Sequence, residues 1–221
     1  MQEQINNTAI KIFLVSFCTL EDICFLKTIY ELNDILVGVD QGTKHLLESD
    51  LIPHFIIGDF DSFTLPTNFA LKSKIITLEK EKDYSDLEYA LNNLPFLLDS
   101  ELKFSDYEVI IINNMQGRID HILSTLFLMK KRKNISIQSA TQKIFFIDKK
   151  IQISLPINTT ISLIPMSHEV KNITTKGLYY PLCNESLFLH QSRGISNLSL
   201  ESLVQIEFHD GELLCVINNN M

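Results

Sequence analysis

Short apolar segments alternate with segments of helical spacing over the first 142 residues. The expected strands are 12–15, 35–39, 54–57, 74–78, 109–112 and 135–139. Between them apolar residues recur at helical spacing, as at Phe25, Leu26, Ile29 and Tyr30, and residues 43–51 are expected to form a short helix. Continuous apolar strands that alternate with helices are typical of a parallel sheet covered on both faces. We therefore expect an α/β domain over residues 1–142.

The helical spacing ends after about residue 143. Short apolar runs follow at 144–147, 151–155, 160–164, 187–189, 203–208 and 213–217. Asp210-Gly211, between the last two runs, is a hairpin turn signal. Consecutive short strands predict a small antiparallel β-sandwich or barrel over residues 143–221.

Composition excludes some classes of protein. The chain has 221 residues with 45% hydrophobic residues, enough for one large or two small domains. A net charge of −8 argues against non-specific nucleic-acid binding, which needs a basic face. We expect no membrane span and a cytoplasmic protein, because no apolar run approaches the length of a span and no signal-peptide pattern is present. The four cysteines lack a Cys-x-x-Cys arrangement, so we expect buried, reduced thiols.

An acidic pair follows the third expected strand, in the segment Gly58-Asp59-Phe60-Asp61-Ser62. Side chains two apart on an extended chain point the same way, so Asp59 and Asp61 are expected to lie together at the strand end. Oxygen ligands shared with a phosphate-bearing substrate suit Mg²⁺. The alternative is a solvated acidic loop.

A second acidic segment, residues 81–91, follows the fourth strand. Ser85 with Glu88 fits a capping box, which predicts Ser85 as a helix N-cap and Asp86 as the first helical residue. An aspartate at that place can simply complement the helix dipole. Its position at a strand's carboxyl end, where ligands of open α/β sheets bind, favours a functional role.

The third motif is Gly117-Arg118-Ile119-Asp120-His121, between a strand and a helix. The Arg118 guanidinium suits a phosphate, and a helix N-terminus adds backbone donors. Alternatively, Asp120 complements the helix dipole and His121 is a surface residue. Asp40, which ends the second strand, is a further carboxylate. Four acidic strand ends with one guanidinium suit Mg²⁺-nucleotide chemistry, and the sequence has no Gly-rich phosphate loop.

Taken in order, these motifs resemble thiamine pyrophosphokinases. The matching segments are 40–42, 53–62, 82–91, 117–121, 162–165, 175–182 and 196–197. The resemblance implies an α/β domain, a β domain, and a homodimer with active sites between subunits. It also implies pyrophosphoryl transfer from ATP to the thiamine hydroxyl, which gives thiamine diphosphate and AMP.

The resemblance also implies roles for particular residues. Asp59, Asp61 and Asp86 match Mg²⁺ ligands. Catalytic positions are Asp83, Asp120 and Arg118, with Asp83 or Asp120 as the acceptor of the alcohol proton. ATP-binding positions are Asp40, Gly42, Ser62, Arg118 and His121. Thiamine-binding positions are Tyr180, Ser196 and Asn197. Gln41 and Gln116 stand where the family usually has glycine, and Ser85 where it usually has threonine.

Three rival functions remain open at this point. A pyrophosphokinase of the same chemistry could use a pterin alcohol as its acceptor. A non-catalytic nucleotide or thiamine sensor could retain the site without turnover. A phosphohydrolase could form an aspartyl-phosphate on Asp59 or Asp61.

Overall fold

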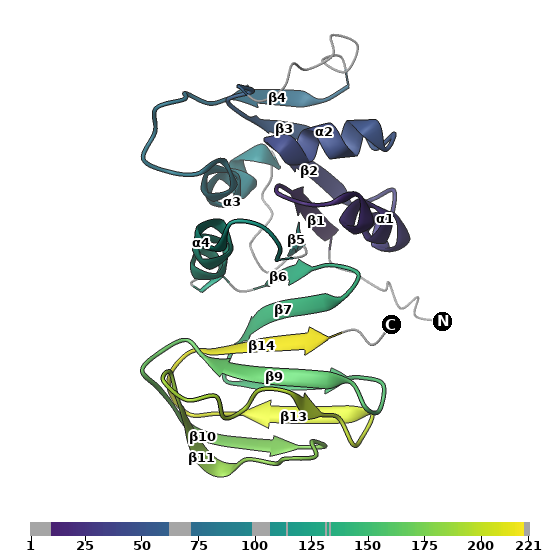
Figure 1. The fold of residues 1–221 in the computed structure, drawn as a ribbon. Coiled ribbons are helices and arrows are strands. Elements are labelled where there is room, and N and C mark those ends of the chain that lie inside the picture. The colour runs from purple at the N-terminus through teal and green to yellow at the C-terminus, as the bar shows by residue number, and fades with distance from the viewer. Residues whose placement is uncertain are drawn as a thin grey trace, which may run out of the picture. The chain divides into compact units, whose positions relative to one another are not determined.

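The chain folds into two compact units, Met1–Gly117 and Arg118–Met221 (Figure 1). The computed structural model describes residues 10–61, 72–98, 107–113, 115–130, 132 and 134–218. The expected domain boundary at residue 142 followed the change from alternating elements to consecutive strands, and it stays a prediction. No helix in the described ranges is long and apolar enough to cross a bilayer.

Unit 1 contains a parallel sheet. Its strands, in spatial order, are β5 (Tyr107–Ile112), β1 (Ile10–Val15), β2 (Ile35–Val39), β3 (Phe55–Gly58) and β4 (Lys74–Thr77). Its helices are α1 (Leu20–Ile29), α2 (Gln41–Glu48) and α3 (Asp86–Leu97). The predicted α/β architecture is confirmed for this unit.

Both faces of the central strands are buried. Phe13 and Val15 of β1 pack against Leu26 of α1 and Leu46 of α2. Alternate residues such as Ile12 and Leu14 face the other way and are just as buried. Figure 1 draws α3 on the opposite side of the strands from α1 and α2. This two-sided burial explains why the strands are continuous apolar runs in the sequence.

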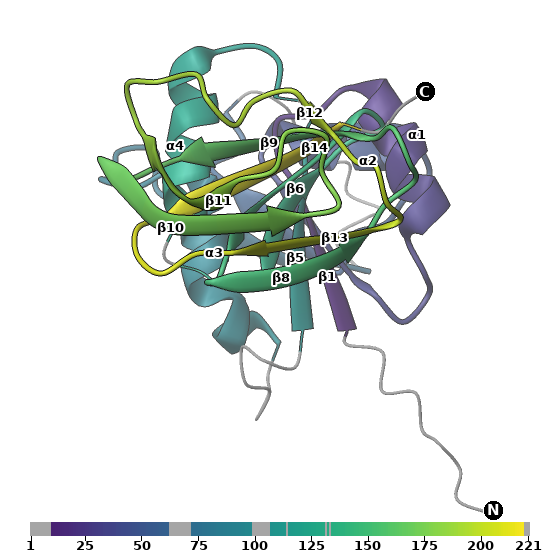
Figure 2. The same ribbon diagram turned by 90° about the horizontal axis from the view of Figure 1, so that it is seen from below.

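Unit 2 begins with α4 (Ile119–Met129) and is otherwise β structure. One sheet has the order β12 (Asn197–Leu198), β9 (Thr160–Pro165), β14 (Leu213–Asn218), β7 (Gln142–Ile147) and β6 (Ile135–Gln138). The other has the order β11 (Cys183–Phe188), β10 (Glu169–Lys176), β13 (Leu203–Glu207) and β8 (Lys150–Ser154), of which Figure 2 shows β10, β13 and β8 side by side. Apolar side chains from both sheets, including Leu163, Cys215, Val170 and Ile206, share one core. The predicted antiparallel β-sandwich is confirmed.

Two details of the prediction were wrong. Asp210-Gly211 does not close a hairpin, because β13 and β14 lie in different sheets; the segment crosses between them, with Gly211 at a φ of 100°. Two of the cysteines expected to be buried, Cys24 and Cys183, are exposed, whereas Cys18 and Cys215 are buried.

Candidate functional site

The carboxyl ends of β2 and β3 bring two of the predicted acids together. Val39 pairs with Ile57 in the parallel register, and Asp40 N–H donates to the Ile57 carbonyl at 2.8 Å. Asp40 therefore lies directly beside the start of the segment Gly58–Asp61. Together with Asp86, the acids of these segments, Asp40, Asp59 and Asp61, make up what we call the acidic edge.

Asp40 has a strained backbone, with φ 48° and ψ −125°. Such a conformation costs a non-glycine residue on the order of 1–3 kcal/mol and is found disproportionately at functional sites. The helix α2 begins at the next residue, Gln41. Gly42 is buried, and a Cβ there would lie 2.1 Å from the Val15 carbonyl oxygen. Glycine at 42 is thus required by the close approach of α2 to β1.

The segment that carries Asp59 and Asp61 is not part of a strand. β3 ends at Gly58, and Phe60 has a φ of 54°. The Asp59 carboxylate accepts the Asp61 N–H at 3.1 Å. The expectation that both side chains share one face of an extended strand was therefore wrong, because the backbone is not extended at Phe60. Ser62, the last residue of the motif, lies outside the described residues.

The N-terminus of α3 brings Asp86 to the same place. Ser85 is the N-cap, as predicted, and its hydroxyl accepts the Glu88 N–H at 3.1 Å. Asp86 is the first helical residue. Asp83, in the preceding loop, is exposed.

Lys82 is the residue that the sequence reasoning missed. Its ammonium lies 2.9 Å from Asp86 Oδ1 and 3.6 Å from Asp59 Oδ2. The three side chains are only 10%, 14% and 16% exposed for Lys82, Asp86 and Asp59. The i, i+4 spacing of Lys82 and Asp86 was a signal in the sequence, but no local pattern pointed to the contact with Asp59.

The charges of the acidic edge act on one another. Burial raises the pKa of Asp40, and the charges of Asp86, Asp59 and Asp61 raise it further. The hydrogen bond from the Asp61 backbone and the charge of Lys82 hold the pKa of Asp59 below its ordinary value. Burial opposes the charged form of Lys82, yet its pairing with Asp86 and Asp59 leaves the Lys82 pKa raised. The four acids and this lysine therefore form one electrostatic cluster.

The donor set of this cluster suits Mg²⁺, which prefers oxygen ligands. Asp86 Oδ1 is buried without a hydrogen bond of good geometry, although the Lys82 ammonium is close to it. Within the described ranges, no three acidic, histidine or cysteine side chains lie close enough together to hold a metal ion by themselves. Mg²⁺ does not require one, because it is usually held by one or two carboxylates together with water and substrate phosphates.

The third motif lies in unit 2, at the start of α4. Arg118 is the N-cap, and its Nε and Nη2 atoms donate to the two Asp120 oxygens at 3.1 and 2.5 Å. This pairing raises the pKa of Arg118 and lowers the pKa of Asp120. Arg118, Asp120 and His121 are all exposed. That they share one site with the acidic edge of unit 1 stays a prediction.

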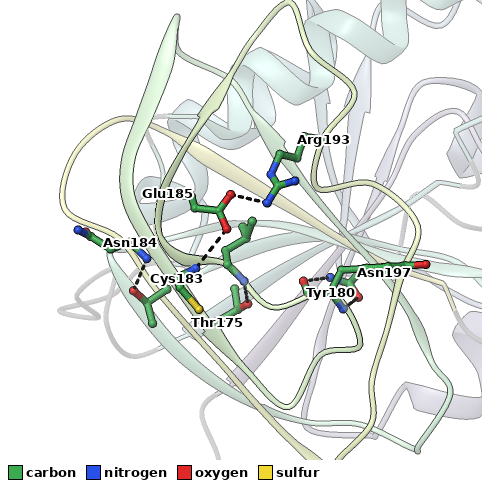
Figure 3. Close-up of polar contacts among 9 residues, drawn as sticks. Thr175, Tyr180, Cys183, Asn184, Glu185, Arg193 and Asn197 are labelled. Carbon is green, nitrogen blue, oxygen red and sulfur yellow. Dashed lines mark hydrogen bonds and ion pairs between the residues drawn. The ribbon is translucent and has the colours of Figure 1, made fainter.

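The three predicted thiamine residues also belong to unit 2. Asn197 is buried, and its side-chain amide accepts the Tyr180 N–H at 2.9 Å and donates to the Tyr180 carbonyl at 2.7 Å (Figure 3). Tyr180 is 66% exposed, and its ring packs edge to face against Tyr179, with 4.7 Å between ring centroids. Ser196 has a φ of 54°, and its N–H donates to the Ser162 hydroxyl at 2.9 Å. Asn197 thus holds the backbone that presents an exposed aromatic ring.

Comparison with known proteins gives matches over both units. The family model described as thiamin pyrophosphokinase, catalytic domain, matches residues 26–139, and the vitamin B1 binding domain model of the same family matches residues 147–213. A thiamine pyrophosphokinase of Bacillus subtilis is 30% identical over 198 residues, which cover 83% of this chain and 87% of that protein.

Solved structures agree with these matches. A crystal structure of thiamine pyrophosphokinase from Bacillus subtilis has a TM-score of 0.80 at 26% identity, and covers 96% of this chain and 100% of its own. A thiamin pyrophosphokinase from Geobacillus thermodenitrificans has a TM-score of 0.75 at 26% identity. The match covers 96% of this chain and 98% of that protein. The resemblance found in the sequence motifs is confirmed.

Proposed function

The chain belongs to the thiamin pyrophosphokinase family, and from that premise we propose that it transfers the pyrophosphoryl group of ATP to the hydroxyl of thiamine. The products are thiamine diphosphate and AMP. The observation that carries the proposal is the acidic edge. Asp40, Asp59 and Asp86 come from three separate segments, and the charges of Asp59 and Asp86 raise the pKa of Asp40. Such a group of oxygen ligands at the carboxyl edge of a parallel sheet suits a metal–nucleotide substrate.

The phosphates of ATP belong at this edge. Asp59, Asp61 and Asp86 are the proposed Mg²⁺ ligands, with Asp40, Gly42 and the N-terminus of α2 beside them. When bound, Mg²⁺ supplies positive charge to the phosphate oxygens and so favours attack on the β-phosphorus. Ser62 and His121 are the remaining proposed ATP contacts.

Arg118 is proposed to bind a phosphate oxygen with its guanidinium. To do so it exchanges the Asp120 carboxylate for a phosphate. Either anion can accept two hydrogen bonds from the guanidinium. Asp83 or Asp120 is proposed to accept the proton of the thiamine alcohol.

Thiamine is proposed to contact Tyr180 and the neighbouring Ser196. Thiamine carries a permanent positive charge on a flat ring, and an exposed aromatic face attracts such a cation. Because the Asn197 amide is engaged with the Tyr180 backbone, we assign Asn197 the role of positioning Tyr180. We also propose a homodimer and a cytoplasmic location, where ATP is available.

The test is an acceptor panel with purified protein, ATP and Mg²⁺. Thiamine should be converted to thiamine diphosphate, identified by mass, whereas a pterin alcohol should not react. Conversion of the pterin alone would contradict the thiamine assignment. Binding of both substrates without product would favour the sensor, and a covalent aspartyl-phosphate with phosphate release would favour the phosphohydrolase.

A further inference from the structure

We propose that Lys82 is a built-in counter-cation of the acidic edge, which holds Asp59 and Asp86 together without metal and which Mg²⁺ must displace to use both carboxylates. This inference rests on the proposed function, because it takes these two acids as metal ligands. It concerns a residue for which neither the sequence motifs nor the family resemblance suggested a role.

The Lys82 ammonium is held by one hydrogen bond and two ion pairs. It donates to the Glu79 carbonyl at 2.8 Å, and it lies 2.9 Å from Asp86 Oδ1 and 3.6 Å from Asp59 Oδ2. The side chain is 10% exposed, which is unusual for lysine unless it is paired.

The position between the two acids is the one that a cation favours. Asp59 follows β3 and Asp86 begins α3, so the two carboxylates come from segments far apart in the sequence. Without a positive group between them, their negative charges would repel each other. Lys82 supplies one positive charge there, and the carbonyl of Glu79 fixes the ammonium against the loop.

The Lys82 ammonium and a magnesium ion compete for these two carboxylates, because two positive charges repel each other strongly at such short separations. The energy of the two ion pairs is therefore lost when the metal takes both carboxylates. Lys82 accordingly weakens Mg²⁺ binding to the nucleotide-free enzyme. It also stabilises that metal-free state against carboxylate repulsion.

The first experiment compares the full-length wild type with Lys82→Met by calorimetric Mg²⁺ titration without nucleotide. Lys82→Met should bind Mg²⁺ about fivefold more tightly. This factor corresponds to the loss of one competing ion pair whose free energy lies at the upper end of the range measured for ion pairs on protein surfaces. In EDTA its melting temperature should fall below that of the wild type, and Mg²⁺ should narrow the difference. Lys82→Arg, which keeps the charge, should bind Mg²⁺ much as the wild type does.

Lys80→Met is the matched control, because Lys80 is an exposed lysine two residues away. It removes the same net charge from the same loop, so any general electrostatic effect appears in both variants. Unchanged or weaker Mg²⁺ binding by Lys82→Met, or an equal gain in Lys80→Met, would overturn the proposal.

A second measurement uses only the wild type, in case Lys82→Met does not fold. Reductive methylation, followed by peptide mass spectrometry, gives the reactivity of each lysine. Mg²⁺ without nucleotide should increase the labelling of Lys82 and leave Lys80 unchanged, because the ammonium is released. Labelling of Lys82 that stays constant or falls with Mg²⁺ would contradict the displacement. If the wild type makes thiamine diphosphate but either test fails, only the role of Lys82 is wrong; if it makes none, the proposed function itself fails.

Discussion

At the scale of single residues, part of the backbone strain lies in or near the predicted motifs. Ten non-glycine residues in the described part of the chain have positive φ values, and four of them are Asp40, Phe60, Met115 and Ser196. These four lie within two residues of a segment that was assigned a role from its sequence. Such conformations persist only where surrounding contacts hold them, and they concentrate at ligand-binding sites. Gly211, by contrast, has a positive φ at a sheet-to-sheet crossing and needs no functional explanation.

Replacing Asp61 by Asn tests the metal assignment. The change removes a charged ligand of the metal ion that stabilises the negative charge of the transition state. Turnover should therefore fall at least about 100-fold. The melting temperature should change little, because Asp61 is exposed. Asp50→Asn, at an exposed position of the same unit, is the control and should keep normal turnover. A folded Asp61→Asn protein with near-normal turnover would remove Asp61 from the site.

The cysteines allow a test of the core at residue scale. Burial raises the pKa of Cys215 to about 12, and burial together with the charge of Asp22 raises the pKa of Cys18 to about 12. At pH 8 both thiols are protonated as well as covered, and only thiolates react readily. A disulfide reagent should therefore titrate two thiols, Cys24 and Cys183, in the native protein. In denaturant it should titrate all four. Rapid reaction of more than two thiols in the native protein would mean that one of the two hydrophobic cores opens to solvent.

At the scale of elements, the sequence was most informative where one element depends on local signals. The N-cap at Ser85 and the strand β2 could be predicted, because capping and continuous burial leave direct marks on the sequence. β10 was missed because its sequence, Glu169–Lys176, is mostly polar, and a register irregularity between the buried residues Val170 and Ile173 breaks the two-residue alternation.

Contacts between distant segments left no such marks. Asp210-Gly211 fits a hairpin locally, but the pairing of β13 with β8 and of β14 with β9 decides its real path. The contact of Lys82 with Asp59 likewise joins two loops that only the folded sheet brings together. The acidic residues of the site could thus be predicted, whereas the lysine among them could not.

Asn197 offers a prediction at the scale of elements, because its amide joins β12 to the segment before β11 through Tyr180. Asn197→Leu leaves these backbone groups without that partner and should cost about 1–3 kcal/mol in the free energy of unfolding. The KM for thiamine should rise while the KM for ATP stays unchanged. Gln191→Leu, an amide-to-apolar change at an exposed position of the same unit, should alter neither. An equal rise in both KM values would place Asn197 outside a thiamine-specific role.

At the scale of the whole molecule, unit 2 exposes several large apolar side chains. Ile119, Leu123 and Phe127 recur every four residues on α4 and are 66%, 43% and 57% exposed. Tyr179, Tyr180 and Leu198 are exposed on the β structure of the same unit. Together these residues offer apolar area that a second subunit could cover.

We predict a two-fold symmetric homodimer, the commonest closed assembly. Light scattering at micromolar concentration should give twice the chain mass of 25.4 kDa. Dilution that produces monomers should reduce the specific activity in proportion to the fraction of dimer that is lost. A monomer with full activity under these conditions would contradict the dimer and the proposed sharing of the site between subunits.

The central claim, pyrophosphoryl transfer from ATP to thiamine, is tested most directly by phosphorus NMR of one reaction mixture that contains the purified protein, ATP, Mg²⁺ and thiamine. Because attack falls on the β-phosphorus, AMP and thiamine diphosphate should appear in equal amounts as ATP disappears. No ADP or inorganic phosphate should accumulate, and without thiamine the ATP signals should persist. Formation of ADP with thiamine monophosphate, or release of phosphate without any thiamine product, would contradict the account.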